Sequence, residues 1–206
     1  MNVDSEAQQQ FERQLQAALK QVAPYAIRTA SADRTGTPGI PAAVLILFAW
    51  EVGQPHVLLT KRTEFVDTHK GQYAFPGGRV ETEDPSIVST ALRETEEEVG
   101  IPISWVRVLG ELPGLGTPTG YWIIPVVGIL NQALARTPLK INAEETEEAF
   151  WVSLAELRQE GVYRSEELIL GAHTVSVAVY QLGARKIWGA TAAMLKNLLD
   201  RLANVG

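Results

Sequence analysis

An unbroken apolar run limits the fold of this chain more than any other segment. From Ile40 to Trp50 the sequence is IPAAVLILFAW, which is rich in residues that favour strands. A continuous run of this kind predicts a strand that is buried on both faces. It is too short to cross a bilayer as a helix, because a spanning helix needs about 20 apolar residues.

Composition excludes several classes of protein. The 206 residues are 46% hydrophobic and 20% charged, as expected for a soluble domain. A net charge of −6 disfavours nucleic acid as a partner, and the absence of cysteine excludes disulfide scaffolds, thiolate zinc sites and a cysteine nucleophile. The N-terminal sequence MNVDSEAQQQ has no basic stretch before an apolar run, so we expect a cytoplasmic protein without a membrane partner.

Hydrophobic periodicity predicts an α+β fold. Residues 5–22 and 187–204 carry apolar side chains at helical spacing, and strands are expected at several runs between them, YWIIPVVGIL among them. We expect a mixed-sheet domain over residues 40–206 and an N-terminal helix and linker over residues 1–39. The helix has three open roles: a docking helix, a mobile arm, or an oligomer contact that would give a homodimer.

The segment RETEEEVGI places four glutamates in five positions of an expected helix. Asp84 and Pro85 are suited to begin that helix as N-cap and first residue, and Gly100 to end it. At about 100° per residue, Val88, Leu92, Thr95 and Val99 form one stripe. Glu94, Glu97 and Glu98 form a second stripe, which is either a solvated face or a site for a hard divalent cation such as Mg²⁺ or Mn²⁺.

A glycine pair precedes the acidic helix. In AFPGGRVETEDP, Gly77 and Gly78 allow backbone conformations closed to other residues and let a ligand approach the main chain. A plain turn would explain the pair alone. Followed by a capped acidic helix, the pair indicates a functional unit.

These residues resemble the Nudix box, G-x5-E-x7-R-E-U-x-E-E-x-G-U, in which U is aliphatic. The chain departs from it in three ways: Asp84 replaces Glu, eight residues separate Asp84 from Arg93, and Thr95 replaces an aliphatic residue. The matching positions are Gly78, Arg93, Glu94, Glu97, Glu98, Gly100 and Ile101.

An upstream motif resembles the coenzyme A diphosphatase branch of that family. LLTKRTEFVDTHKGQYAFPGG, residues 58–78, follows the pattern L-L-T-x2-S/A-x3-R-x3-G-x3-F-P-G-G. Thr63 stands at the Ser/Ala position, and Asp67 at the Arg position inverts the charge. The branch also tends to carry Asp and the longer spacing in its box. The resemblance covers roughly residues 40–200.

The resemblance implies an α/β/α sandwich and metal-dependent hydrolysis of a diphosphate bridge. Glu94, Glu97 and Glu98 would hold Mg²⁺ or Mn²⁺, with the carbonyl of Gly77 as a further ligand. Arg93 would pair with a box carboxylate and fix its rotamer.

The residue that takes the proton from water is left open between the box and a later segment. Glu94 is one candidate, and NAEETEEAFW supplies Glu144, Glu145, Glu147 and Glu148, of which we favour Glu145. Candidate substrate contacts are Arg62, His69, Lys70 and Gly78, with Lys61 as a further cation. Trp122 and Trp188 are suited to stack on a base or to pack in the core.

Three functions follow from these residues. The first is hydrolysis of coenzyme A or its thioesters to 3′,5′-ADP and 4′-phosphopantetheine or its acyl derivative. The second is hydrolysis of another nucleoside diphosphate derivative, such as ADP-ribose or NADH. The third is a nucleotide-binding module of the same fold without turnover.

Overall fold

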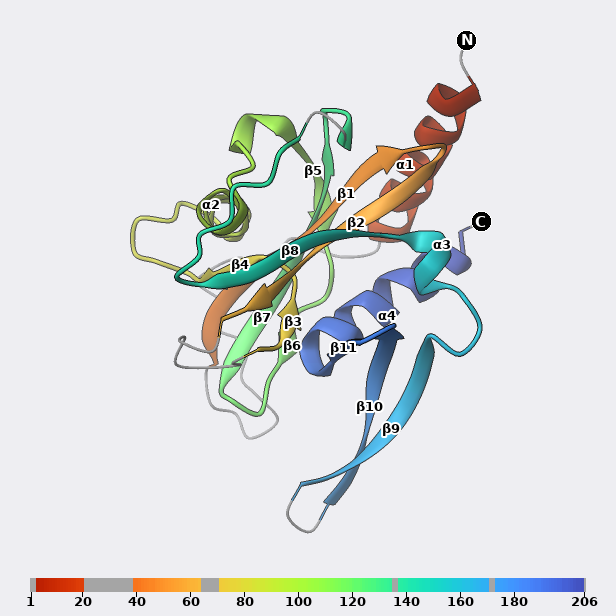
Figure 1. The fold of residues 1–206 in the computed structure, drawn as a ribbon. Coiled ribbons are helices and arrows are strands. Elements are labelled where there is room, and N and C mark those ends of the chain that lie inside the picture. The colour runs from red at the N-terminus through yellow and green to blue at the C-terminus, as the bar shows by residue number, and fades with distance from the viewer. Residues whose placement is uncertain (1–2, 21–38, 64–70, 135–136, 171–172, 206) are drawn as a thin grey trace.

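The computed structural model describes residues 3–20, 39–63, 71–134, 137–170 and 173–205 (Figure 1). Within these ranges the helices are α1 (Val3–Leu19), α2 (Ile87–Val99), α3 (Leu154–Leu157) and α4 (Gly189–Ala203), with a 3₁₀ turn at Ile103–Trp105. The strands are β1 (Ile40–Glu51), β2 (Gln54–Arg62), β3 (Tyr73–Ala74), β4 (Gly77–Arg79), β5 (Val106–Glu111), β6 (Leu115–Gly116), β7 (Tyr121–Leu130), β8 (Thr146–Ser153), β9 (Tyr163–Leu170), β10 (His173–Leu182) and β11 (Arg185–Trp188).

The main sheet is mixed, as the sequence predicts. Its central path runs β3-β2-β1-β7-β5, and β4, β6 and β8 pair with strands of that path. Strands β1 and β7 are parallel, whereas β1 pairs antiparallel with β2 and β7 pairs antiparallel with β5. The apolar run therefore forms the central strand, flanked by neighbours on both edges.

Helices cover both faces of this sheet. Leu45 and Leu47 of β1 pack beneath α2, whereas Ile46 and Phe48 point to the opposite face. Buried residues of α1 and α4 join Ile46 and Phe48 in one cluster. Figure 1 shows α2 on one side of the sheet and α1 with α4 on the other. The predicted α/β/α arrangement is confirmed.

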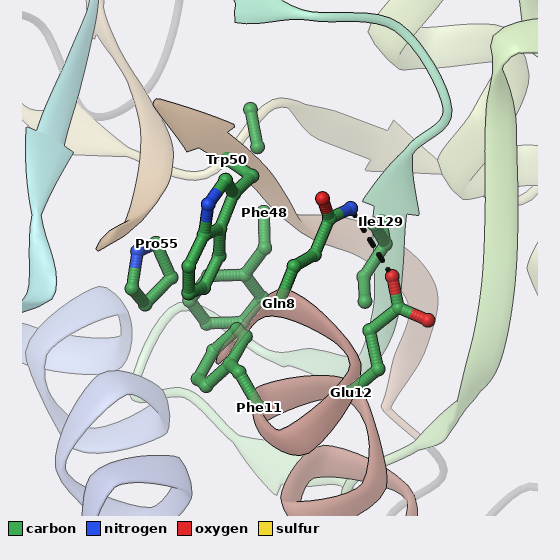
Figure 2. A pocket seen from close by; sticks show the side chains of 8 residues that line it. Gln8, Phe11, Glu12, Phe48, Trp50, Pro55 and Ile129 are labelled. Atoms are coloured by element: carbon green, nitrogen blue, oxygen red, sulfur yellow. Dashed lines mark hydrogen bonds between the residues drawn. The ribbon is translucent and has the colours of Figure 1, made fainter. Parts of the chain in front are cut away.

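The N-terminal helix packs against the domain. Leu15 and Leu19 are buried, as their helical spacing predicts. Figure 2 shows Phe11 beside Phe48 and Trp50, and the rings of Phe11 and Phe48 meet edge to face with centroids 5.3 Å apart. Gln8 donates a hydrogen bond to Glu12 beside a small pocket between α1 and β1. Of the three roles left open for the helix, docking is the one seen over residues 3–19; residues 21–38 lie outside the described ranges.

A second, smaller sheet follows β8. Strands β9, β10 and β11 pair antiparallel in the order β11-β10-β9, and α4 packs against β10 and β11. The expected C-terminal helix begins two residues later than predicted, because Ile187 and Trp188 belong to β11, and Trp188 occupies the N-cap position of α4. None of the described helices is long and apolar enough to cross a membrane.

The acidic helix α2 begins at a different cap from the one the sequence suggests. Ser86 is the N-cap, since its side-chain oxygen accepts from the backbone N–H of Ser89 at 3.1 Å. Asp84 lies outside the helix and accepts hydrogen bonds from Arg93 instead. At the far end Gly100 takes the predicted left-handed conformation, with φ 69° and ψ 23°.

Candidate functional site

The glycine pair forms the floor of the site. Gly78 lies opposite Ala43 of β1, and a Cβ atom built on it would fall 2.4 Å from Oε1 of Glu94. Gly77 has φ +153°, and a Cβ there would meet the carbonyl oxygen of Ala43 at 2.2 Å. The side-chain carboxylate of Glu94 therefore rests directly on the main chain, in space that only glycine leaves free.

Arg93 holds three carboxylates together. Its guanidinium grips Asp84 with two hydrogen bonds of 3.0 Å, from Nε to Oδ1 and from Nη2 to Oδ2. Its Nη1 atom lies 3.0 Å from Glu94 Oε1 and 3.0 Å from Glu97 Oε2. The expected pairing of Arg93 with a box carboxylate is therefore present, and the paired fork geometry fixes the guanidinium plane.

Asp84 is the anchor of this network. It also accepts hydrogen bonds from the Glu81 backbone N–H at 2.9 Å and from the Thr90 hydroxyl at 2.8 Å. The hydrogen bonds from Arg93 lower the pKa of Asp84 to about 2, with burial opposing them and the other two donors adding to them. Asp84, which replaces the Glu of the family box, thus fixes Arg93 in position. The prediction that Asp84 is the N-cap of α2 was wrong.

Glu98 is buried, which the sequence did not predict. The exposed fractions of the Glu98, Glu94 and Glu97 side chains are 4%, 13% and 55%, so the three glutamates do not share one solvated stripe. The interpretation as a solvated face was wrong for Glu98, because the helix presses it against the strand end at Gly77, whose N–H donates to its carboxylate.

Burial and like charges perturb the two inner glutamates. Desolvation raises the pKa of Glu98 to about 8; Arg62 opposes that shift, and Glu94 and Glu145 add to it. Desolvation also raises the pKa of Glu94, with Arg93 opposing and Glu97 and Glu145 adding. Carboxylates that repel each other while buried are a common arrangement at catalytic and ion-binding sites.

The turn before β8 brings Glu145 toward these carboxylates. Thr63, at the end of β2, donates its backbone N–H to the Glu145 carbonyl at 3.0 Å and its hydroxyl to the Glu144 carbonyl at 3.0 Å. Asn142 donates its backbone N–H to the Glu98 carbonyl at 2.9 Å. The hydrogen bonds from Thr63 and from Asn142 fix this turn beside the C-terminal end of α2.

The other acidic candidates have different partners. Glu147 pairs with Lys61 at 2.7 Å, and Glu148 pairs with Arg185. Glu144 and Glu145 are exposed, and Glu145 is the one whose charge reaches Glu94 and Glu98. This electrostatic effect sets Glu145 apart from the rest of its charge run.

The remaining candidates divide between the site and its surroundings. Arg62 reaches into the site, with Nη1 3.8 Å from Glu98 Oε1. Trp122 is half-buried in the cluster beneath α2, and Trp188 is partly exposed at the start of α4, so the structure pairs neither with the carboxylates. The predictions for Asp67, His69 and Lys70 concern residues 64–70, which lie outside the described ranges.

The donor set fits a divalent cation. Within the described residues no three acidic or histidine side chains are already arranged around one point, because Arg93 and Arg62 draw the carboxylates toward themselves. Glu94, Glu97, Glu98 and Glu145 are nonetheless hard oxygen donors, and they repel one another beside two glycines. Mg²⁺ and Mn²⁺ prefer such ligands.

Two features of the site were missed by the sequence analysis. Asp84 holds Arg93 across nine residues, and Arg79 hydrogen-bonds to Tyr121 across 42 residues. The first had a signal, since Asp84 occupies the box position of an acidic residue. The second had none, because only the pairing of β1 with both β4 and β7 brings Arg79 to Tyr121.

Comparison with known proteins agrees with this geometry. A model of the NUDIX domain matches residues 39–170. A protein described as an uncharacterized Nudix hydrolase, NudL, from Yersinia pestis (strain Pestoides F) is 38% identical over 152 residues, which cover 73% of this chain and 74% of the relative. NudL of Yersinia pseudotuberculosis serotype O:1b (strain IP 31758) matches equally well, with 38% identity over 152 residues and the same 73% and 74% coverage.

A solved structure supports the fold alone. A MutT/nudix family protein from Enterococcus faecalis superposes with a TM-score of 0.54 at 17% identity, over 97% of this chain and 69% of that one.

Fold and site together define a hydrolase of phosphorus-containing anhydrides, a class that generally uses divalent cations such as Mg²⁺ or Mn²⁺. The chain belongs to the Nudix hydrolase family, and its activity is hydrolysis of a nucleoside diphosphate derivative.

Proposed function

We propose that this enzyme hydrolyses the diphosphate bridge of coenzyme A or its thioesters, giving 3′,5′-ADP and 4′-phosphopantetheine or its acyl derivative. The observation that carries the hydrolytic site is the packing of the Glu94 and Glu98 carboxylates against the main chain at Gly77 and Gly78. Support for the substrate comes from the motif over residues 58–78, whose described parts form the end of β2, β3 and β4 beside that site.

Glu94, Glu97, Glu98 and the carbonyl of Gly77 would hold the divalent cation. When bound, the cation would neutralise charge on the diphosphate and make a water molecule easier to deprotonate. Arg93 keeps Glu94 and Glu97 in place through contacts of 3.0 Å.

Glu145 is our choice for the residue that takes the proton from the attacking water, with Glu94 as the other candidate. Glu145 is exposed, Thr63 fixes its backbone carbonyl, and its charge acts on both Glu94 and Glu98. A carboxylate in that position can accept a proton and pass it to bulk water. Water then attacks one phosphorus, the bridging P–O bond breaks, and the bridging oxygen leaves with the other phosphate.

Two alternatives compete with this proposal. The first is another nucleoside diphosphate derivative such as ADP-ribose or NADH, favoured by the inverted charge at Asp67. The second, a binding module without turnover, conflicts with the family assignment and with the complete set of box glutamates. A screen of coenzyme A, ADP-ribose, NADH and dinucleoside polyphosphates with Mg²⁺ and Mn²⁺ separates all three. If the enzyme hydrolysed none of these compounds, that result would contradict the proposal.

Glu97→Gln tests the site itself. Glu97 is an exposed carboxylate of α2, so its loss should leave the fold intact and lower kcat by about 100-fold or more. Glu96→Gln is the matched control, because Glu96 is the adjacent exposed glutamate on the same helix, and it should keep parental activity. Equal rates for Glu97→Gln and the parent would remove Glu97 from the proposed site.

A further inference from the structure

The cations around the site are almost all neutralised by carboxylates. Within the described residues, Lys61 pairs with Glu147, Arg62 lies near Glu98, and Arg93 pairs with its three carboxylates. Arg185, on the neighbouring strand β11, pairs with Glu148. Each of these guanidinium or ammonium groups therefore has a negative partner before any substrate binds.

Arg79 differs from them. It immediately follows the glycine pair, is exposed, and forms no ion pair with a carboxylate in the described part of the chain. Its Nε atom donates to the hydroxyl of Tyr121 at 2.8 Å, Nη2 donates to the same oxygen, and the guanidinium carbon lies 5.2 Å from the ring centroid. Tyr121 therefore holds the guanidinium of Arg79 in place, and no carboxylate of the described residues neutralises its charge.

Tyr121 is itself fixed. Its backbone N–H donates to the hydroxyl of Thr117 at 3.0 Å, and the Thr117 N–H donates to the Tyr121 carbonyl at 2.8 Å. This closes the loop between β6 and β7 and sets the phenol at the start of β7. An exposed arginine ordinarily loses conformational freedom when it binds an anion, and the phenol removes part of that cost in advance.

Arg79 lies next to the cleavage site without belonging to it. Its carbonyl accepts from Arg93 Nη2 at 3.3 Å, and its neighbour Gly78 supports Glu94. Successive side chains of a strand point to opposite faces, so Arg79 points away from the side on which Gly78 meets Glu94. A ligand whose diphosphate lies at Gly77 and Gly78 would therefore meet Arg79 with a different group.

We propose that Arg79, positioned by Tyr121, binds a phosphomonoester that the substrate carries outside its diphosphate bridge. This rests on the proposed function, in which that group is the 3′-phosphate of coenzyme A. A guanidinium offers paired donors that match a phosphate dianion, and no carboxylate of the described residues pairs with Arg79. The cation for the 3′-phosphate is then Arg79, in place of Arg62, Lys61 and Lys70, the candidate cations of the upstream motif.

Calorimetric titration of the intact protein with 3′,5′-ADP and with 5′-AMP tests the assignment, because these ligands differ only by the 3′-phosphate. We expect the parent to bind 3′,5′-ADP about tenfold more tightly or better. Arg79→Gln should abolish the difference and leave the affinity for 5′-AMP unchanged. Arg79→Lys should retain part of the preference for 3′,5′-ADP, and Tyr121→Phe should reduce that preference.

Arg164→Gln is the control, since it changes the net charge equally but lies on β9 and pairs with Glu166. It should keep the full preference. The assignment is overturned if Arg79→Gln keeps the preference, or if it weakens both ligands equally, as a general charge effect would. A parent that shows no preference overturns it as well.

Steady-state rates separate this assignment from the proposed function. With coenzyme A, Arg79→Gln should raise KM about tenfold with little change in kcat; with 3′-dephospho-coenzyme A it should change neither. If the parent cleaves coenzyme A and Arg79→Gln has parental KM, the function stands and the assignment falls. If the parent cleaves no coenzyme A, the proposed function falls.

Discussion

At the residue scale, one arginine organises the acidic side chains that electrostatics would otherwise drive apart. Arg93 is fixed by Asp84, which is almost fully buried and accepts hydrogen bonds from two further donors. The same guanidinium reaches Glu94 and Glu97. The charge on Asp84 therefore acts on the site indirectly, by keeping Arg93 where it can hold the other two carboxylates.

The raised pKa of Glu98 predicts how stability depends on pH. Burial is the main reason that this pKa rises from 4.5 to about 8. Between those values the folded state binds more protons than the unfolded state, so the Glu98 contribution to stability is complete below about 4.5 and is lost as pH rises through about 8. Glu98→Gln removes this titration, and its free energy of unfolding should fall less over that interval.

Urea unfolding in the presence of a chelator, at several pH values between 5 and 9, measures the effect. The parent should lose stability across this range, and Glu98→Gln should have the flatter profile. A residual slope is expected in the variant, because the pKa of Glu94 is also raised by burial. Parallel profiles for the parent and Glu98→Gln would contradict the buried, perturbed carboxylate.

At the element scale, two adjacent glycines have different tasks, and substitution should separate them. The three atoms nearest to a Cβ atom on Gly78 all belong to the end of the flexible Glu94 side chain, the closest at 2.4 Å. Gly78→Ala should therefore keep the fold and displace the carboxylate, lowering kcat about tenfold to 100-fold, since small misplacements of catalytic groups are costly. A Cβ atom on Gly77 would instead meet the backbone, with Ala43 O at 2.2 Å and Val44 Cα at 2.6 Å. Gly77→Ala should therefore lower the stability of the fold.

Circular dichroism melting and turnover, measured on both variants, distinguish the two tasks. We expect Gly78→Ala to melt near the parental temperature with low activity, and Gly77→Ala to melt well below it. Gly120→Ala tests the influence of a positive φ alone, because Gly120 has φ +85° with no neighbour within 4 Å. If Gly78→Ala retains full turnover, the support that Gly78 gives to Glu94 has no catalytic role.

Local patterns predicted the elements, and long-range contacts decided the site. The strands around Ile40–Trp50 and the helix ending at Gly100 follow from periodicity and capping. The helical repeat also predicted that three glutamates converge. It could not predict the burial of Glu98, which depends on contact with Gly77 from another element. Nor could it choose Ser86 over Asp84 as N-cap, because both residue types are favoured there and tertiary pairing with Arg93 takes Asp84.

At the scale of the whole molecule, the two faces of the sheet have separate tasks. The face beneath α2 carries the acidic residues, and the opposite face carries the α1 and α4 core with Leu15, Phe48 and Leu195. An ion pair between Glu12 and Arg107 also ties α1 to β5. Substitutions in the α1 core should therefore change the free energy of unfolding without changing the chemistry.

Leu15→Ala tests this separation. Leu15 is fully buried between α1 and the sheet, so truncation should lower the free energy of unfolding by about 2–5 kcal/mol, through lost burial and the cavity left behind. At temperatures well below melting, kcat and KM should match the parent, because, within the described residues, the core cluster that contains Leu15 includes none of the site residues. Gln16→Ala, an exposed neighbour on the same helix, is the matched control and should change the free energy of unfolding by less than about 0.5 kcal/mol. A stable Leu15→Ala variant would mean that α1 contributes little to the fold, whereas a large fall in kcat at low temperature would show that the two faces of the sheet are coupled.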